Sequence, residues 1–334
     1  MIDLSLIWVV IIAVGVLIYV VLDGFDLGIG ILFPLVKDRQ ERDVMMNTVA
    51  PVWDGNETWM VLGGAGLFAA FPLVYSTVLS ALYMPIILMV ISLIFRGVAF
   101  EFRFKANRTK HLWDQAFIWG SILASFFQGM ILGAYIQGIE TTNGIYSGGG
   151  LDWLTPFSIF TGIAVVVLYA SLGCGWLIFK TDARVQNHMF SLMPKLIIAL
   201  LVIFAAVSIY TPMVHAEIAN RWFSLPQLYY FSPVPILVVV FTLLALRACK
   251  RRQEFAPFIY TLALVLLAYT GFLISLWPNI IPPSVTIWQA AAPQSSQLFA
   301  LIGALVLIPI ILFYTALSYW VFRDKVRVGD DGYH

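Results

Sequence analysis

Four carboxylates occur in two pairs whose spacing could serve proton transfer. Asp23 and Asp26 lie in the run VVLDGFDLGIGILFPLV, and Asp54 and Glu57 lie in APVWDGNETWMVLGG. The residues of each pair are three apart, so in a helix they share one face. Carboxyls held close together in a low-dielectric surrounding cannot all remain ionised, and they would therefore share protons. This pattern indicates a group of side chains that binds and passes protons.

The apolar surroundings of these carboxylates place them inside a membrane. About ten apolar residues follow Asp26 before the charged loop at Lys37, so a regular helix holds the pair on the order of 15 Å from that loop. An Asp at the centre of a membrane helix costs roughly 2.5–3.5 kcal/mol, which calls for a partner, a proton or water. Antiparallel packing of the first two helices would set all four carboxyls at similar depth. Arg96, in SLIFRGVAFEF, is the expected permanent counter-charge.

A purely structural interpretation of the same residues is open at this point. If the first helix is broken between Gly24 and Gly30, its two Asp residues could cap a half-helix at a wet interface, and Asp54 could cap the second helix. For Glu101 and Asp114, which flank a basic loop, the expectation is interfacial ion pairing rather than a functional role.

The elements that must position these residues are membrane helices. The chain has 334 residues, of which 61% are hydrophobic and only 11% are charged, whereas a soluble globular protein carries about 25% charged residues. We predict an all-α, polytopic bundle that forms a single integral membrane domain over residues 1–334, with no soluble domain. The apolar runs predict nine spans, at about 5–33, 52–73, 77–98, 112–138, 155–179, 191–213, 231–248, 256–277 and 297–322. Only the Phe71-Pro72 region separates the second span from the third.

The basic residues predict the orientation of the bundle. With nine spans, all but one of the 19 Lys and Arg residues fall on the side of the odd-numbered loops and the C-terminus, and Arg221 alone falls on the other side. Basic loops stay in the cytoplasm, so the N-terminus is expected outside and the C-terminus inside. The start, MIDLSLIWVV, lacks a positively charged segment and is expected to be a retained helix rather than a signal peptide.

Redox chemistry of its own is not expected of this chain. Haem and metal sites in helical bundles need histidines that project between helices, and the four histidines, His111, His188, His215 and His334, all lie outside the predicted spans. We therefore predict no metal site, and the net charge of +1 gives no reason to expect nucleic acid. Two classes remain: a stand-alone proton-coupled transporter, or a proton-conducting subunit of a larger complex. Carriers place polar groups in both halves, and here they concentrate in the first two helices, which favours the subunit.

Several motifs resemble subunit II of the cytochrome bd-type quinol oxidases, including the cyanide-insensitive oxidases. They are DGFDLGIG from Asp23, APVWDGNETW from Ala50, FRGVAFEFR from Phe95, TIWQAAAPQSSQL from Thr286 and IPIILFYTALSYW from Ile308. The resemblance extends from the first predicted helix to the last. The chain is short for the family and lacks loop extensions of its longer members.

The resemblance implies a role in a respiratory enzyme of the bacterial cytoplasmic (inner) membrane. That enzyme is a terminal oxidase that oxidises quinol, reduces O2 to water and generates a proton motive force. Haems b558, b595 and d, or a b-type replacement, are expected on subunit I, with this chain as its haem-free, pseudo-symmetric partner. Membrane lipid, a structural quinone and small single-helix accessory subunits are further partners that the resemblance implies for some members.

The resemblance also implies roles for individual residues. Asp54 matches the motif position assigned to a proton path from the cytoplasm, and Asp23 and Asp26 match the acidic pair beside it. Glu57 follows WDGN, at a position that is not always acidic in the family. The structural quinone has no residue signature that transfers to this chain, so no cofactor-binding residue is assigned.

Overall fold

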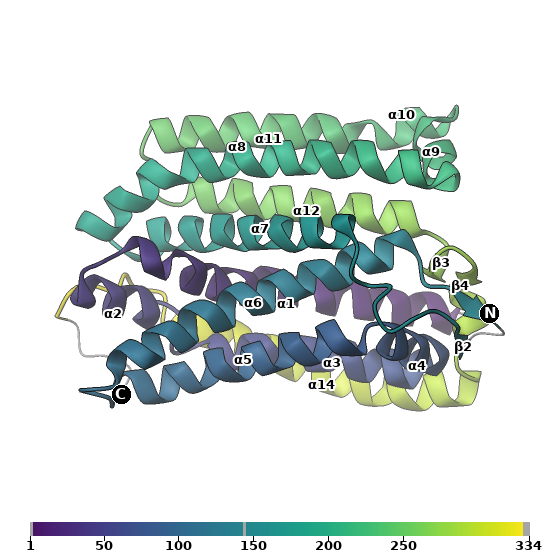
Figure 1. Ribbon diagram of the computed structural model, residues 1–334, viewed down its shortest axis with the longest axis horizontal. Coiled ribbons are helices and arrows are strands. Elements are labelled where there is room, and N and C mark those ends of the chain that lie inside the picture. The colour runs from purple at the N-terminus through teal and green to yellow at the C-terminus, as the bar shows by residue number, and fades with distance from the viewer. Residues whose placement is uncertain (1–2, 143–144, 330–334) are drawn as a thin grey trace.

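The protein is a bundle of long helices that run side by side (Figure 1). The computed structural model describes residues 3–142 and 145–329. The elements are α1 (Leu4–Leu32), η1 (Phe33–Leu35), α2 (Arg39–Asn47), α3 (Trp53–Ala70), α4 (Pro72–Ala81), α5 (Tyr83–Arg103), α6 (Lys110–Gln137), β1 (Thr141–Thr142), β2 (Ile145–Tyr146), α7 (Pro156–Lys180), α8 (Ala183–Val214), α9 (Ala216–Phe223), α10 (Gln227–Phe231), α11 (Pro233–Lys250), α12 (Ala256–Leu276), β3 (Asn279–Ile281), β4 (Val285–Thr286), α13 (Ile287–Ala290) and α14 (Gln294–Val321). The strands form two short antiparallel hairpins, β1–β2 and β3–β4.

The predicted helical membrane bundle of about nine spans is confirmed. In the described part of the chain, eight helices are long and apolar enough to cross a membrane, and the bent pair α3–α4 supplies a ninth. The described chain begins and ends at opposite ends of the bundle (Figure 1), as an odd number of spans requires. Which end faces the cytoplasm stays a prediction from the basic residues.

The predicted boundaries of the second and third spans are wrong. The chain turns by 120° between α3 and α4, because Pro72 has no N–H to continue α3 and restricts the backbone of Phe71 before it. Helix α4 then packs against the hairpin strands β2 and β3 and against α13. Its residues are apolar because they cover one end of the bundle, so α5 begins only at Tyr83 and runs on to Arg103. Helix α8 also begins earlier than predicted, at Ala183 instead of 191, since its first turns are polar.

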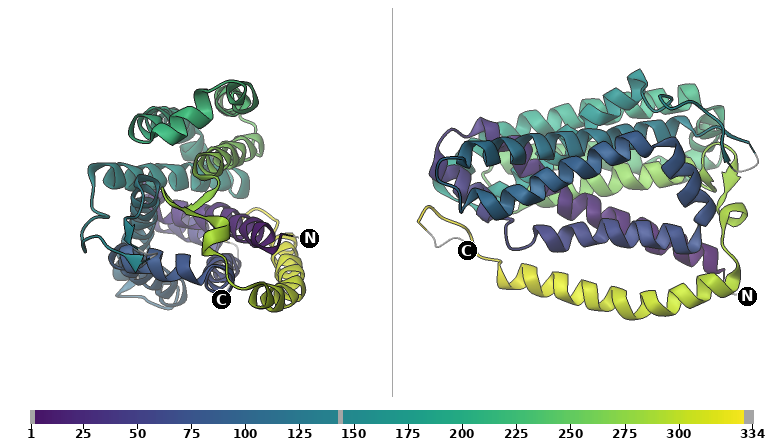
Figure 2. Two further views of the ribbon diagram at one scale, coloured as in Figure 1. Left: turned by 90° about the vertical axis from the view of Figure 1, so that its right-hand side faces the viewer. Right: turned by 60° about the horizontal axis from the view of Figure 1, so that its bottom comes forward.

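Helix α1 packs between two groups of helices, and its second half lies in the interior. On one side α7, α8, α11 and α12 pack together, and on the other lie α3, α5 and α6. Helix α14 runs along the outside of α3 and also contacts α1 (Figure 2). Every residue of α1 from Asp23 to Gly30 is buried, so both of its carboxylates point into protein.

The glycines after Asp23 allow close helix packing rather than a break in the helix. Helix α1 is continuous through Gly24 and Gly30. A Cβ on Gly28 would lie 1.9 Å from the Tyr169 carbonyl oxygen of α7, and a Cβ on Gly173 would lie 2.5 Å from the Gly28 carbonyl carbon. The two backbones are therefore in direct contact, as small residues permit in membrane bundles. The broken-helix interpretation is wrong, and so is Asp54 as a cap, because Val52 occupies the N-cap of α3 and no side chain caps it.

The chain after α14 is attached to the loop between α11 and α12. Lys325 Nζ lies 2.8 Å from Glu254 Oε2, and Gln186 Nε2 donates to Glu254 Oε1 at 3.1 Å. The hydrogen bond from Lys325, followed by that from Gln186, lowers the pKa of Glu254 below its usual 4.5. A carboxyl whose pKa is lowered in the folded state stabilises that state above its unfolded pKa, and the contribution is lost as the pH falls through the folded pKa.

We expect Glu254→Gln to lower the melting temperature slightly at pH 7, by about 1 °C for an exposed pair. The difference between the variant and the unmodified protein should shrink as the pH falls below 4.5, because the carboxyl becomes neutral in both states. Thermal unfolding followed by circular dichroism between pH 3 and pH 7 measures this. A difference that stays constant over this range would show that the ion pair contributes nothing.

Candidate functional site

Two of the four predicted carboxylates contact one guanidinium in the interior, and a third lies one helical turn away. Arg96 Nη2, from α5, lies 2.5 Å from Asp23 Oδ1 of α1 and 2.6 Å from Glu57 Oε1 of α3. The side chains of Arg96 and Asp23 are 0% and 1% exposed, whereas that of Glu57 is 26% exposed. With Asp26, one turn after Asp23 and fully buried, these residues form what we call the carboxylate cluster.

Close packing of α5 against α6 turns Arg96 inward. A Cβ on Gly120 of α6 would lie 2.8 Å from the backbone nitrogen of Arg96, so no larger residue fits between the helices there. The guanidinium carbon also lies 5.7 Å from the ring centre of Trp53 and 5.9 Å from that of Phe100. A buried guanidinium is stable only if carboxylates pair with it, and α1 and α3 supply them.

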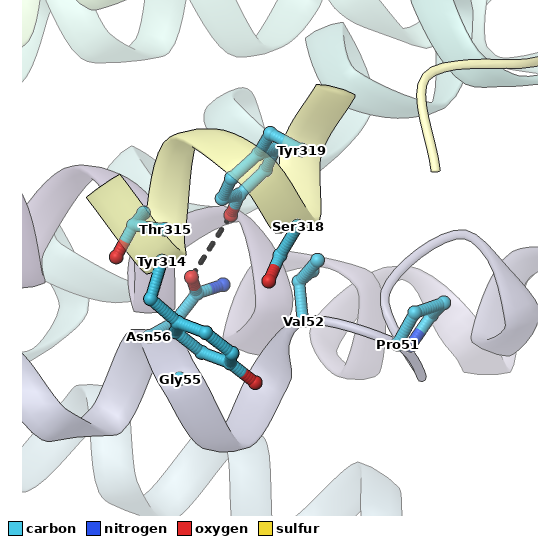
Figure 3. Close-up of a pocket in the computed structure, with 8 residues that line it drawn as sticks. All are labelled: Pro51, Val52, Gly55, Asn56, Tyr314, Thr315, Ser318 and Tyr319. Atoms are coloured by element: carbon cyan, nitrogen blue, oxygen red, sulfur yellow. Dashed lines mark hydrogen bonds between the residues drawn. The ribbon is translucent and has the colours of Figure 1, made fainter. Parts of the chain in front are cut away.

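Asp26 is oriented by a chain of two hydrogen bonds from α3 and α14. Asn56 Nδ2 donates to Asp26 Oδ2 at 2.7 Å, and the Tyr319 hydroxyl donates to Asn56 Oδ1 at 2.9 Å. Figure 3 shows Tyr319 directed from α14 toward Asn56 on α3. The Asn56 amide holds one oxygen of the carboxyl in place, and the other oxygen, Oδ1, is buried without a hydrogen-bond partner in the described chain.

A second polar chain continues from Asp23 toward the middle of the bundle. Tyr19 lies four residues before Asp23, on the same face of α1. Gln128 Nε2 of α6 donates to the Tyr19 hydroxyl at 2.7 Å, and the Tyr169 hydroxyl of α7 donates to Gln128 Oε1 at 2.7 Å. Polar groups therefore follow one another across three helices beyond the cluster.

The carboxylate cluster has unused hydrogen-bonding capacity. Asp23 Oδ2, Asp26 Oδ1 and the Nε and Nη1 atoms of Arg96 are buried and have no hydrogen-bond partner among residues 3–142 and 145–329. The cluster also holds three carboxyls against one guanidinium. Protons on the carboxyls reduce the net charge that a low-dielectric interior must hold, so this arrangement can bind and release protons.

Asp54 is the predicted site residue that the structure does not bring into the cluster. It is exposed, and within the described ranges its carboxylate makes no hydrogen bond or ion pair. It lies three residues before Glu57, close enough for the two charges to interact. The proton-transfer roles of Asp54, Asp23, Asp26 and Glu57, and that of Arg96 as their counter-charge, stay predictions.

A separate group of ion pairs joins α2, α5 and α6. Arg103 Nε lies 2.5 Å from Asp114 Oδ1, and Arg103 Nη1 lies 2.6 Å from Asp43 Oδ1. Arg42 and Lys110 complete the pairing of these two carboxylates at 3.0 Å each. The predicted pairing of Asp114 is confirmed, as is that of Glu101, which lies 3.6 Å from Lys105. Arg103 is fully buried, although its place in the sequence suggested an ordinary loop charge.

Sequence reasoning missed part of the polar network. Gln128 carried a usable signal, because it is an amide inside a predicted apolar span. Tyr319, Tyr19 and Tyr169 carried none, since a tyrosine in a membrane helix is as compatible with packing as with hydrogen bonding.

In the described part of the chain the histidines give no indication of a haem or metal site. His111 is the second residue of α6, His188 lies in the first turns of α8, and His215 lies between α8 and α9, while His334 lies outside the described residues. Over those residues no group of three or more His, Cys, Asp or Glu side chains could hold a metal ion.

Comparison with known proteins agrees with the motifs. The family model of cytochrome bd terminal oxidase subunit II matches residues 4–322. Subunit 2 of the cytochrome bd-I ubiquinol oxidase of Escherichia coli (strain K12) is 29% identical, over 98% of this chain and 96% of the relative. Subunit 2 of the cytochrome bd ubiquinol oxidase of Bacillus subtilis (strain 168) is also 29% identical, over 96% of each.

A solved structure shares the fold. The bd oxidase from Geobacillus thermodenitrificans contains a chain that superposes with a TM-score of 0.80 and 16% identity, over 96% of this chain and 98% of that one. Because the family model spans nearly the whole chain, the resemblance seen in the motifs is confirmed. The chain belongs to the cytochrome bd terminal oxidase subunit II family, as a multi-pass protein of the bacterial inner membrane.

Proposed function

We propose that this chain is the haem-free subunit II of a quinol:O2 oxidoreductase, and that its carboxylate cluster passes protons from the cytoplasm toward the haems of subunit I. Family membership implies an oxidoreductase complex with a partner subunit I. The observation that carries the proton-transfer role is that the buried Asp23 and the partly exposed Glu57 share a single Arg96, with the buried Asp26 one turn from Asp23. The carboxyls outnumber the cations in this cluster, and the membrane interior can accommodate them if some carry protons. A group of carboxyls that is partly protonated is suited to proton transfer.

The proposed route begins at Asp54 and runs inward along α3. Asp54 is exposed and can exchange protons with water, and Glu57, one turn further on, is partly exposed. Glu57 and Asp23 both contact the same nitrogen of Arg96. A proton that moves between these two carboxyls leaves the total charge around the guanidinium unchanged, so the step needs little reorganisation. Asp26 follows Asp23 on the same face of α1 and shares the proton with it.

We propose that subunit I covers the face formed by α3, α5 and α14. On α3 an exposed row begins with Asp54 and continues through Val61 and Phe68. Large apolar side chains are also exposed on the two other helices, such as Ile91 of α5 and Phe313 of α14. A carboxylate at the start of such an apolar face would meet cytoplasmic water at the rim of the interface. Protons collected by the cluster could cross to subunit I at this face.

The redox groups are proposed to belong to subunit I. The relatives' names specify ubiquinol, and we propose a quinol as the electron donor here. Haems b558, b595 and d, or a b-type replacement, would supply the oxygen chemistry there. Uptake of protons from the cytoplasm and release of quinol protons outside would make the reaction electrogenic. The match over residues 4–322 favours this role over a stand-alone proton-coupled transporter.

Asp54→Asn tests the route. We expect oxidase turnover to fall about tenfold, the change produced when a barrier rises by about 1.4 kcal/mol, because the amide cannot take up a proton. Assembly and haem content should be unchanged, since Asp54 is exposed and supports no contact in the described chain. The measurement is oxygen consumption with excess quinol, together with the visible spectrum of the purified complex.

Glu101→Gln is the matched control, because Glu101 is another exposed carboxylate, 57% exposed, on α5. Its turnover should equal that of the unmodified complex. Full turnover in Asp54→Asn would contradict the proposed route. Loss of the haem spectrum in that variant would instead show that Asp54 has a structural role. A haem-free preparation that is inactive toward oxygen, purified with native partners, would favour the transporter.

A further inference from the structure

The buried ammonium of Lys180 holds the end of α14 against α7. Lys180 is the last residue of α7 and is 3% exposed. Its Nζ donates to the carbonyl oxygens of Phe322 and Asp324, each at 2.6 Å, and its own carbonyl accepts from the backbone nitrogen of Val326 at 2.9 Å. Three hydrogen bonds from one residue thus attach the segment that directly follows α14.

A lysine suits this place for two physical reasons. Phe322 is the C-cap residue of α14, so its carbonyl has no partner within the helix, and a cation near that end of the helix is favourable. A buried ammonium is costly unless it is hydrogen-bonded, so Lys180 and these carbonyls stabilise one another. The neighbouring pairs Lys325–Glu254 and Arg327–Asp182 are more exposed, and pairs of that kind contribute little.

Helix α14 depends on such attachments because it packs against the bundle along a narrow row only. Leu301 and Ala304 are buried, whereas Phe299, Leu305 and Phe313 are among its many exposed side chains. Figure 2 shows the helix at the edge of the bundle. The hydrogen bonds of Lys180 therefore add to the contacts of Tyr319 in fixing the position of the last turn of α14.

That last turn carries Tyr319, which donates to Asn56, the residue that orients Asp26. The ring of Tyr319 lies 6.0 Å from that of Trp176, edge to face, and the Lys180 ammonium lies 5.7 Å from the same Trp176 ring. Lys180 and Tyr319 are therefore joined both through the backbone after α14 and through a shared aromatic neighbour.

The contact between Tyr319 and Asn56 also borders a pocket between α3 and α14. Asn56, Gly55, Ser318 and Tyr319 are among its lining residues (Figure 3). The volume of the pocket that a water molecule can enter is about 10 Å³. This is close to the smallest volume that can hold one water molecule. A displaced α14 end would widen the pocket next to Asn56, the hydrogen-bond partner of Asp26. The Oδ1 atom of Asp26 is buried and has no hydrogen-bond partner in the described ranges.

We propose that Lys180 is a positioning residue for proton transfer: its hold on the carbonyls after α14 keeps Tyr319 on Asn56, and thereby keeps the Asp26 carboxyl oriented within the carboxylate cluster. This inference rests on the proposed function of the cluster. Lys180 touches no reacting group and acts only through α14.

Lys180→Met tests the inference in the intact complex. We expect backbone amides of residues 318–326 to exchange with deuterium about tenfold faster, since two hydrogen bonds from a charged donor are lost. Turnover should fall several-fold with the KM for quinol unchanged, because the Asn56 bond that orients Asp26 is weakened. Lys180→Arg, which can still donate to two carbonyls, should restore both measurements. Lys325→Met, which removes an exposed neighbouring pair, should change both much less.

Tyr319→Phe separates positioning from a general loss of stability. Tyr319→Phe removes only the hydroxyl, so it should lower turnover as Lys180→Met does. If both residues act through the same contact, the double variant Lys180→Met with Tyr319→Phe should turn over no more slowly than the slower of the two single variants. Unchanged deuterium exchange in Lys180→Met would overturn the proposed hold on α14, whatever the function of the cluster. Normal turnover in Tyr319→Phe, or additive losses in the double variant, would overturn the link to Asp26. Failure of the proposed function itself would appear separately, as full turnover in Asp54→Asn.

Discussion

Arg96→Met is expected to prevent accumulation of the assembled complex. The substitution leaves the Asp23 carboxylate fully buried and the Glu57 carboxylate largely buried, with no cation between them. Removal of one partner from a buried ion pair costs about 3–5 kcal/mol, a large part of the 5–15 kcal/mol that typically separates folded from unfolded protein. The yield of haem-containing complex from equal amounts of membrane, and its melting temperature, measure the effect.

The reason for the loss can be tested by a second substitution. In the double variant Asp23→Asn with Arg96→Met the most buried charge is removed together with its partner, so much of the yield should return. Arg108→Met is the matched control, because Arg108 is exposed, and its yield should be normal. A stable, fully assembled Arg96→Met complex would show that the carboxylates do not depend on the guanidinium.

Gly28→Ala is expected to have the second large effect. Its Cβ would lie 1.9 Å from the Tyr169 carbonyl oxygen and 2.8 Å from the Gly173 nitrogen. Both are backbone atoms, so α1 and α7 must move apart along their length. Overpacked sites lose about 1–3 kcal/mol when side chains can adjust, and the loss here should reach at least the upper end of that range. The melting temperature of the purified complex should fall or the complex should not assemble.

Gly15→Ala is the control on the same helix. Its Cβ would meet the Leu62 Cδ2 atom at 3.6 Å, an ordinary contact, and alanine favours helix over glycine. The melting temperature of this variant should be unchanged or higher. Equal melting temperatures for Gly28→Ala and Gly15→Ala would contradict the backbone contact between α1 and α7.

The local signals in the chain were sufficient for most of the fold. Long apolar runs bounded by charges predicted about nine membrane helices, because a helix is the simplest way for an uncharged segment to satisfy its backbone in lipid. The prediction failed at Phe71-Pro72, where apolarity continues but direction changes. Hydropathy measures how apolar a segment is and not where its axis points, so α4 could not be distinguished from the start of a span.

In the candidate site, too, local spacing predicted some features, whereas packing between helices decided the others. The i, i+3 spacing of Asp23 and Asp26 predicted a shared face, and Arg96 was expected as their counter-charge from its charge and depth alone. The spacing of Asp54 and Glu57 could not show that only Glu57 reaches Arg96. That outcome depends on how α3 is rotated against α1 and α5, which packing between helices determines.

By itself, the sequence determined the class of protein, the approximate number of membrane spans and the types of residue that carry charge in the membrane. These properties follow from the free energy of each segment in lipid. That free energy depends on residues that are close together in the sequence. Only the tertiary structure decided that Asn56 and Tyr319 orient Asp26, that Arg103 is buried, and that Lys180 holds the chain after α14. Each of these contacts joins residues far apart in the chain, and its free energy exists only once the helices are packed.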